Sequence, residues 1–188
     1  MNMQLFEGKR IRLAPPDPEK DAETESQWTH DPEYLRLLDA EPAKPLSVGQ
    51  IKKKHEALAK EQGQKLFQFA IRTQTDDRLI GFVKLFRIEW SHGAGNLTLG
   101  IGSPDDRGKG YGTEALKLSL NYAFNELNLY RLSAATFEYN TDALRFLERA
   151  GFQVEVRRRQ AINRDGRRWD LLVYGLLREE WEASKSQN

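Results

Sequence analysis

The sequence predicts a single α/β domain with a mixed β-sheet, and three observations support this fold class. Segments in which apolar and polar residues alternate, as they do in half-buried strands, recur along the whole chain. Segments with apolar residues at helical spacing lie between these strands, so strands and helices are intermixed. The 188 residues, of which 39% are hydrophobic, suffice for one core, and no repeat or linker divides them.

In the first half of the chain, three segments alternate like strands and two have helical periodicity. The strands are expected at residues 9–13, 66–72 and 79–90, and the helices at residues 18–38 and 47–62. Pro32 divides the first helical segment into two pieces, because proline disrupts a helix interior. Ser47 is a suitable N-cap for the second helix, and Gly63 ends it. A turn at residues 75–77 joins the two longer strands.

The second half of the chain has four strand patterns and two helical ones. The strands are expected at residues 96–101, 131–137, 152–162 and 169–177, and the helices at residues 113–127 and 141–150. Asn140 is a suitable N-cap for the second helix, and Gly151 ends it. The last two strands form a hairpin across residues 163–166. Residues 183–188 are expected to be a flexible tail.

A glycine-rich run, Arg107-Gly108-Lys109-Gly110-Tyr111-Gly112-Thr113, separates the strand at 96–101 from the helix that follows it. The N-terminus of a helix presents unpaired backbone N–H groups and a partial positive charge, which together favour an anion. Glycines let the backbone approach a ligand closely, because no Cβ intervenes. Arg107 and Lys109 would add full positive charges beside these amides. The run therefore predicts a binding site for a pyrophosphate.

Other interpretations of this run fit less well. The phosphate loop of nucleoside triphosphatases requires a Gly-x4-Gly-Lys-Ser/Thr spacing that the chain lacks. The dinucleotide fingerprint G-x-G-x-x-A matches residues 110–115, but residues 103–109 separate that match from the strand. In addition, Tyr130 and Arg131 stand where an acidic residue should bind the ribose. A glycine-rich turn that binds nothing is the remaining alternative.

Two segments in order resemble motifs of the GNAT superfamily of N-acetyltransferases. Residues 101–115 are similar to its motif A, which contains Arg/Gln-x-x-Gly-x-Gly/Ala, and residues 140–152 are similar to its motif B helix, which begins Asn-x-x-Ala and ends Gly-Phe. Residues 8–13 and 174–181 resemble the first strand and the end of the ribosomal-protein-alanine N-acetyltransferase subgroup. The resemblance thus covers residues 8–181, an N-acetyltransferase domain within a single-domain chain.

The resemblance implies a fold, a cofactor and a set of binding residues. The fold would have a mixed, mostly antiparallel sheet of about seven strands with about four helices. The strands on either side of the motif A helix would splay apart, and the pantetheine arm of acetyl-CoA would fill the gap. The acetyl-CoA-binding residues would be Leu99, Ile101, Arg107, Gly108, Lys109, Gly110, Tyr111, Gly112, Thr113 and Asn140.

The chemistry implied is direct attack of a neutral amine on the thioester, and this chain departs from the family's usual acid and base. Leu147 stands where many members have a tyrosine that protonates the thiolate, and Asn96 stands where many have a glutamate base. The catalytic residues therefore stay unassigned. Asn140 is a candidate for such a role, and Glu89, His92, His30 and Glu138 are candidate proton acceptors on chemical grounds alone. No metal ion is expected in the site.

A site without a strong base favours an acceptor amine of low pKa. Deprotonating an α-amine at pH 7 costs roughly 1 kcal/mol, against about 4.6 kcal/mol for a lysine amine. The acceptor is therefore predicted to be the α-amine of a protein or peptide N-terminus. The alternatives are a small-molecule amine, such as a polyamine or an aminoglycoside, and a non-catalytic acyl-CoA-binding domain. The resemblance implies that residues 18–62 and the final hairpin build the acceptor pocket, with Trp28, Tyr34 and Trp90 as candidate lining residues.

Composition sets the expected environment and partners. The chain has no cysteine and no secretory signal, so the cytoplasm is the default location. No apolar stretch suggests a membrane span. A net charge of +1 makes nucleic acid an improbable partner, although six arginines cluster between Arg157 and Arg168. This cluster is either a solvated hairpin face or a contact for an acidic partner. The edge of the final hairpin would permit a homodimer.

Overall fold

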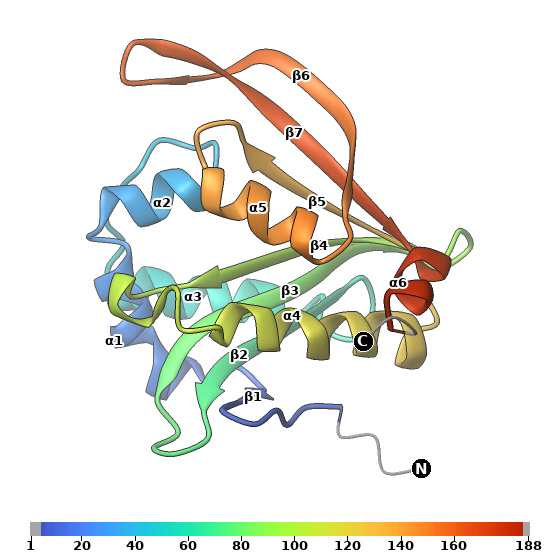
Figure 1. The fold of residues 1–188 in the computed structure, drawn as a ribbon. Coiled ribbons are helices and arrows are strands. Elements are labelled where there is room, and N and C mark those ends of the chain that lie inside the picture. Colours follow the sequence, from blue (N-terminus) through green and yellow to red (C-terminus); the bar gives the residue numbers. More distant parts are fainter. Residues whose placement is uncertain (1–4, 186–188) are drawn as a thin grey trace.

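A seven-stranded sheet forms the centre of the computed structural model, which describes residues 5–185 (Figure 1). Its strands are β1 (Ile11–Ala14), β2 (Leu66–Thr73), β3 (Leu79–Glu89), β4 (Ala94–Ile101), β5 (Arg131–Phe137), β6 (Gln153–Arg164) and β7 (Arg167–Leu177). Their order in the sheet is β1-β2-β3-β4-β5-β7-β6. Neighbouring strands run antiparallel except for β4 and β5, which are parallel. The predicted mixed, mostly antiparallel sheet is therefore confirmed.

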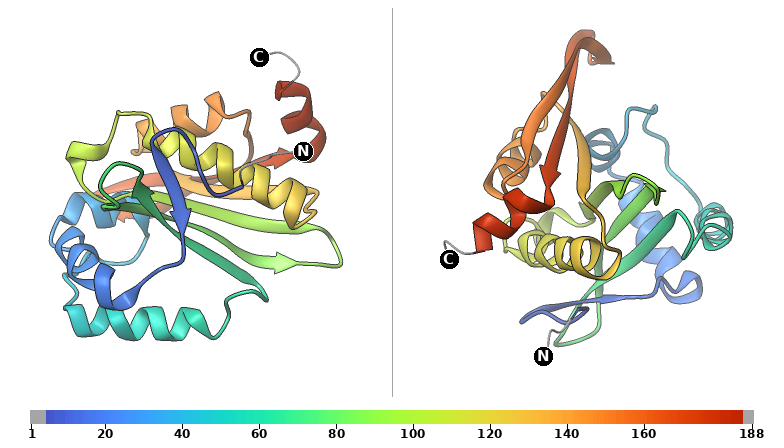
Figure 2. Two further views of the ribbon diagram at one scale, coloured as in Figure 1. Left: turned by 90° about the horizontal axis from the view of Figure 1, so that it is seen from below. Right: turned by 90° about the vertical axis from the view of Figure 1, so that its right-hand side faces the viewer.

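Helices cover both faces of this sheet. They are α1 (Pro18–Trp28), α2 (Pro32–Leu38), α3 (Val48–Ala59), α4 (Tyr111–Asn121), α5 (Thr141–Arg149) and α6 (Arg178–Lys185), with a 3-10 turn at Pro104–Asp106 and a π-helical turn at Tyr122–Glu126. Helices α1 and α3 lie on one face, and α4 lies on the other, beside α5 and α6 (Figures 1 and 2). No helix within residues 5–185 is both long enough and apolar enough to cross a bilayer.

Local capping explains where several helices begin. The Asp17 side chain accepts hydrogen bonds from the first amides of α1, and Asp31 does the same for α2. Ser47 and Gln50 form a reciprocal capping box at the start of α3. The predicted break at Pro32 is confirmed, because this proline occupies the first turn of α2.

The main core lies between the sheet and α4. Ile80, Val83 and Leu85 of β3 face Leu116 and Leu120 of α4, and all five are almost completely buried. Burial of side chains of this size contributes roughly 1.5–3 kcal/mol each. The core thus holds the glycine-rich run, which enters α4, against the central strands.

The parallel pair β4–β5 separates after three residues. Pairing runs only from Ala94 with Arg131 to Asn96 with Ser133. Beyond this point β5 continues beside β7, whereas residues 97–101 of β4 stay paired with β3 alone. The expected splay is therefore present, and it leaves one backbone edge of β4 without a partner strand among residues 5–185.

The C-terminal part of the chain differs from the prediction in two respects. The turn of the final hairpin was predicted over residues 163–166, but it comprises only Asp165 and Gly166, whose φ angles of 52° and 71° suit a two-residue turn. Residues 183–185, assigned to a flexible tail, instead end the helix α6. Trp181 anchors this helix, since its side chain is buried against Phe124 with ring centroids 4.9 Å apart. Residues 186–188 of the predicted tail lie outside the described residues.

Candidate functional site

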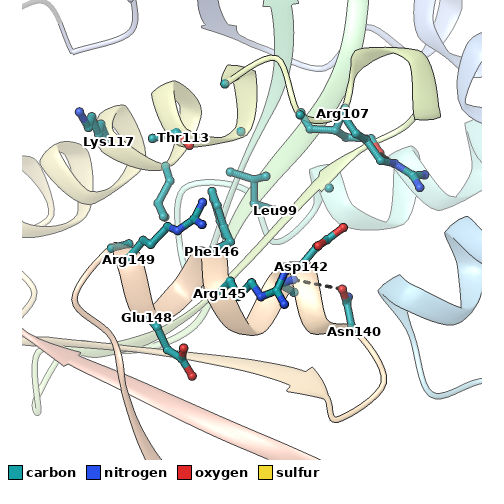
Figure 3. Close-up of a pocket in the computed structure, with 18 of the residues that line it drawn as sticks. Leu99, Arg107, Thr113, Lys117, Asn140, Asp142, Arg145, Phe146, Glu148 and Arg149 are labelled. Atoms are coloured by element: carbon teal, nitrogen blue, oxygen red, sulfur yellow. Dashed lines mark hydrogen bonds between the residues drawn. The ribbon is translucent and has the colours of Figure 1, made fainter.

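A cavity of about 1050 Å³ opens where β4 and β5 separate, and it continues between α4 and α5. Figure 3 shows side chains from both helices converging on this space. The cavity is also lined by the end of β4, the glycine-rich run and part of α2. Its size is that of a pocket for a small molecule or cofactor.

The free edge of β4 forms one wall. Leu99, Gly100 and Ile101 line the cavity, and their backbone groups on this side face no partner strand within the described chain. Buried backbone N–H and C=O groups are nearly always hydrogen-bonded. An extended ligand that carries amide groups could pair with this edge as an added strand would.

The glycine-rich run forms a second wall, and its glycines line the cavity at Gly108, Gly110 and Gly112. Gly110 is the N-cap residue of α4 and has a φ of 83°, a backbone conformation that glycine adopts without strain. No side chain caps α4, so its first amides are open to a ligand. The first turn of α4, including Thr113, thus has the open amides that an anion site requires.

The two cations of the run do not both face the cavity. The Arg107 guanidinium donates to the carbonyls of Ile101 (3.3 Å) and Gly102 (3.0 Å), so it fastens the run to the end of β4. Lys109 is exposed and is not among the lining residues; its carbonyl accepts a 2.6 Å hydrogen bond from Arg10. Tyr111 likewise lies off the cavity, packed against the core below the Arg10 guanidinium.

Positive charge comes instead from three residues outside the glycine-rich run. Lys117 of α4 and Arg145 and Arg149 of α5 all line the cavity, and Figure 3 shows their side chains. Arg145 and Arg149 are four residues apart and therefore share one helix face. This spacing was the only signal in the sequence that could have identified them.

The two acidic side chains beside the run, Asp105 and Asp106, have different surroundings. Asp105 is exposed, but Asp106 is buried and accepts two hydrogen bonds from Arg78, at 2.7 and 2.9 Å. These hydrogen bonds hold the pKa of Asp106 below its usual range. The paired carboxylate fixes the 3-10 turn that leads into the run.

Asn140 and Leu147 have structural roles in α5. Asn140 caps the helix by accepting from the Ala143 amide (3.2 Å), and it donates to the carbonyl of Leu37 in α2 (3.3 Å). It also lines the cavity. Leu147 is buried in the main core, where a tyrosine hydroxyl would meet apolar neighbours. Asn96 lies on β4 at the last residue before the splay.

A second cavity of about 500 Å³ lies on the other face of the sheet, between α1, α2, α3 and strands β2 to β4. Tyr34 and Leu38 of α2 line both cavities, so the two meet at this helix. Burial, together with the nearby Glu25 carboxylate, raises the pKa of Tyr34. Tyr34 therefore stays a neutral hydrogen-bond donor throughout the physiological range.

The three aromatic side chains considered for an acceptor pocket separate in the structure. Trp28 and Tyr34 line the second cavity, with ring centroids 6.1 Å apart. Trp90 does not: it is half exposed beyond the end of β3 and donates to the carbonyl of Gln64 (2.9 Å). Trp90 is therefore excluded from the candidate site.

Known proteins share the sequence pattern of this chain. A family model described as an acetyltransferase (GNAT) domain matches residues 10–153. The Probable N-acetyltransferase YjcK of Bacillus subtilis (strain 168) is 40% identical over 119 residues, which are 62% of this chain and 64% of YjcK. The Spermidine N(1)-acetyltransferase of Escherichia coli (strain K12) is 35% identical over 82 residues, which are 44% of each protein. The chain thus spans less than two thirds of YjcK.

Solved structures share the fold. A spermidine N-acetyltransferase from Vibrio cholerae in complex with CoA and spermine superposes with a TM-score of 0.80 at 20% identity, over 93% of this chain and 99% of that one. A crystal structure of a probable acetyltransferase reaches a TM-score of 0.82 at 22% identity, over 95% and 98% of the two chains. At these identities the likeness establishes the fold alone.

Proposed function

The chain belongs to the GNAT acetyltransferase family, and on this premise we propose that it transfers an acetyl group from acetyl-CoA to a primary amine. The observation that carries the proposal is the free edge of β4 beside an uncapped helix N-terminus, both facing one cavity. An amide-containing arm that ends in a pyrophosphate matches these two features at once.

Each part of acetyl-CoA has a place in this proposal. The pyrophosphate would be bound by the first amides of α4, and the pantetheine arm would lie along residues 99–101. The phosphates have Lys117, Arg145 and Arg149 as counter-charges. Of the residues expected from sequence to bind acetyl-CoA, Lys109 and Tyr111 act through the loop backbone, and Arg107 orders the loop.

The acetyl group would meet the acceptor where the two cavities adjoin at α2. The acceptor amine enters from the second cavity, attacks the thioester carbonyl and forms a tetrahedral intermediate. A backbone N–H on the free edge of β4 would stabilise the oxyanion. Collapse of the intermediate breaks the C–S bond and releases the CoA thiolate, and the proton that the attacking nitrogen loses passes to solvent or to that thiolate.

No strong acid is needed for the leaving group. A thiol of pKa near 8.5 costs roughly 2 kcal/mol to release as the thiolate at pH 7. The neutral Tyr34 hydroxyl could donate a hydrogen bond to that sulfur, since Tyr34 lines both cavities. Such a hydrogen bond would allow the proposed reaction with Leu147 in place of the usual tyrosine.

For the acceptor, we propose an amine of low pKa, such as the α-amine of a peptide or protein N-terminus. The deprotonation cost of roughly 1 kcal/mol at pH 7 is small enough for a site without a dedicated strong base. The ribosomal-protein-alanine subgroup, which the ends of the sequence resemble, would acetylate such an α-amine. The relatives named as spermidine acetyltransferases make a polyamine the second candidate.

A CoA-release assay with matched acceptors tests the proposal. The purified protein and acetyl-CoA are incubated with short peptides bearing a free N-terminus, the same peptides with blocked N-termini, spermidine and an aminoglycoside. We expect CoA release with the free peptides only. Rapid acetylation of spermidine or the aminoglycoside, with the peptides inert, would contradict the α-amine assignment. Tight CoA binding without turnover on any amine would instead indicate a non-catalytic acyl-CoA-binding domain.

A further inference from the structure

Resting on the proposed function, we propose that the second cavity binds a carboxylate of the acceptor through Lys84, so that the preferred substrate is an amine that also carries a carboxylate. Lys84 lies in the middle of β3 with its side chain facing α1 and α3. The cavity adjoins the place where the acetyl group would be transferred. A cation in this position selects among acceptors by charge.

The Lys84 ammonium has no anionic partner within the described chain. No carboxylate of residues 5–185 lies within ion-pair distance of it, and its Nζ atom lies over the Phe82 ring, 5.3 Å from the centroid. The side chain is more than half buried. Burial, with Lys54 adding repulsion, lowers the pKa of Lys84 to about 8. A partly desolvated cation that lacks a carboxylate is usually completed by a ligand or solvent.

A second unsatisfied polar group lies beside it. Gln68 is directly opposite Lys84 in the β2–β3 pair, and Thr98 is directly opposite on β4. These three side chains form a polar row across the sheet, between Phe82 and Phe86, and all five residues line the cavity. The Gln68 Oε1 atom is buried without a hydrogen-bond partner, although such groups are rarely left unpaired. Because an amide oxygen accepts hydrogen bonds, this atom would be completed by an N–H donor of a ligand, such as its amine, whereas the Lys84 ammonium beside it would bind the carboxylate.

Two carboxylates that line the cavity, Glu25 and Asp39, attract the Lys84 ammonium at longer range and partly offset the lowering of its pKa, but neither lies within ion-pair distance of it. Glu25 lies 2.9 Å from the His55 imidazole, and Asp39 accepts from the Glu41 amide at 3.1 Å. Glu61, like the cations Lys54, Lys65 and Arg87, is exposed at the rim. Lys84 is thus the charge that an acceptor meets on the floor of the cavity. The same charge opposes a polyamine, which would bring further ammonium groups into this space.

The test measures kcat/KM, expressed per neutral amine, for acceptors that differ in a carboxylate. One pair compares a free α-amino acid with its α-amide, and the other compares a peptide with aspartate at its second position with the asparagine version. A preference for the carboxylate in the first pair would indicate that the acceptor is a free amino acid. A preference in the second pair would indicate that it is an acidic peptide. We expect at least a tenfold preference for the carboxylate in one pair.

Variants assign the preference to Lys84. Lys84→Met should reduce the preference to less than threefold, chiefly through KM, while the rate with the neutral partner changes little. Lys84→Arg should keep the preference. Lys53→Met, on the exposed side of α3 and outside the cavity lining, is the matched control and should behave as the parent protein.

The pH dependence of the carboxylate preference separates a charge role of Lys84 from a role in packing alone. With a pKa near 8, Lys84 is about nine tenths protonated at pH 7 and about one tenth at pH 9. The preference in the peptide pair should therefore fall as pH rises through 8, and it should persist to pH 9 in Lys84→Arg, whose guanidinium stays charged. Equal turnover of both members of each pair would overturn the carboxylate site. Absence of turnover with every amine would instead overturn the proposed acetyltransferase activity.

Discussion

At the scale of single residues, the two central glycines of the run differ in what they require. Gly110 has a φ of 83°, and a Cβ there would lie 2.8 Å from Arg10 Nη2, so valine would strain the loop as well as obstruct a ligand. Gly112 has an ordinary helical backbone. A Cβ at Gly112 would lie 3.7 Å from Leu99 and 3.8 Å from Phe146, facing the cavity at normal contact distance.

Gly112→Val therefore tests the proposed cofactor site without straining the backbone. The branched side chain should occupy space that the ligand needs and weaken CoA binding at least tenfold, measured by titration calorimetry. Helix propensity predicts no loss of stability, because valine forms helix better than glycine. Gly49→Val is the control, since Gly49 lies in the first turn of α3 and a Cβ there would have no atom within 4 Å. Unchanged CoA affinity in Gly112→Val would show that the ligand binds elsewhere.

At the scale of elements, α4 and α5 are the opposing walls of the larger cavity. Lys117 of α4 and Arg149 of α5 both line it, and no ion pair engages either side chain within residues 5–185. The two helices come from motifs that are well separated in sequence. Their shared positive charge therefore arises only when the fold brings them together.

Replacing these cations should affect the phosphates of CoA more than its pantetheine arm. Lys117→Gln and Arg149→Gln should each weaken CoA about 5- to 30-fold at low salt, because charge-assisted hydrogen bonds contribute roughly 1.5–3 kcal/mol before screening. Dephospho-CoA lacks the 3′-phosphate. If Lys117 and Arg149 bind that phosphate, each substitution should reduce the affinity for dephospho-CoA less than it reduces the affinity for CoA. Lys53→Gln serves as the control of equal charge change. An identical loss for CoA and dephospho-CoA would place the contacts at the pyrophosphate instead.

At the scale of the whole molecule, a buried ion pair joins the helical cover to the sheet. Asp21 of α1 accepts a hydrogen bond from the Arg72 guanidinium of β2, and both side chains are almost completely buried. Arg72 also donates to the Asp77 carbonyl (3.2 Å), and Asp21 accepts from the Asp17 amide (2.9 Å). The pair thus fixes α1, which forms part of the second cavity, against the strands.

Arg72→Met should lower the free energy of unfolding by about 3–5 kcal/mol, because it leaves the Asp21 carboxylate buried without its counter-charge. The double variant Asp21→Leu/Arg72→Met should recover part of that loss, since it removes both charges. Denaturant unfolding measures both effects. A loss below about 1 kcal/mol in the single variant would indicate that water reaches the pair. CoA affinity should change little, because neither residue lines the larger cavity.

Local signals in the sequence were sufficient for most of the fold. The caps at Ser47 and Asn140, the break at Pro32 and the alternation along β2, β3 and β5 act over a few residues, so their structure could be predicted directly. Helix α6 was missed, because its apolar contact is the single buried Trp181 and its remaining side chains are polar. Its stability depends on packing against Phe124, a residue more than fifty positions earlier.

By itself, then, the sequence determined the order of the elements, the glycine-rich entry to α4 and the family to which the chain belongs. The tertiary structure decided which charges face a ligand. Arg107 donates to carbonyls at the end of β4, Asp106 forms an ion pair with Arg78, and Lys84 in the second cavity has no carboxylate within ion-pair distance among the described residues. The physical reason is that backbone conformation depends on neighbouring residues, whereas the partner of a charged side chain is supplied by strands and helices distant in sequence.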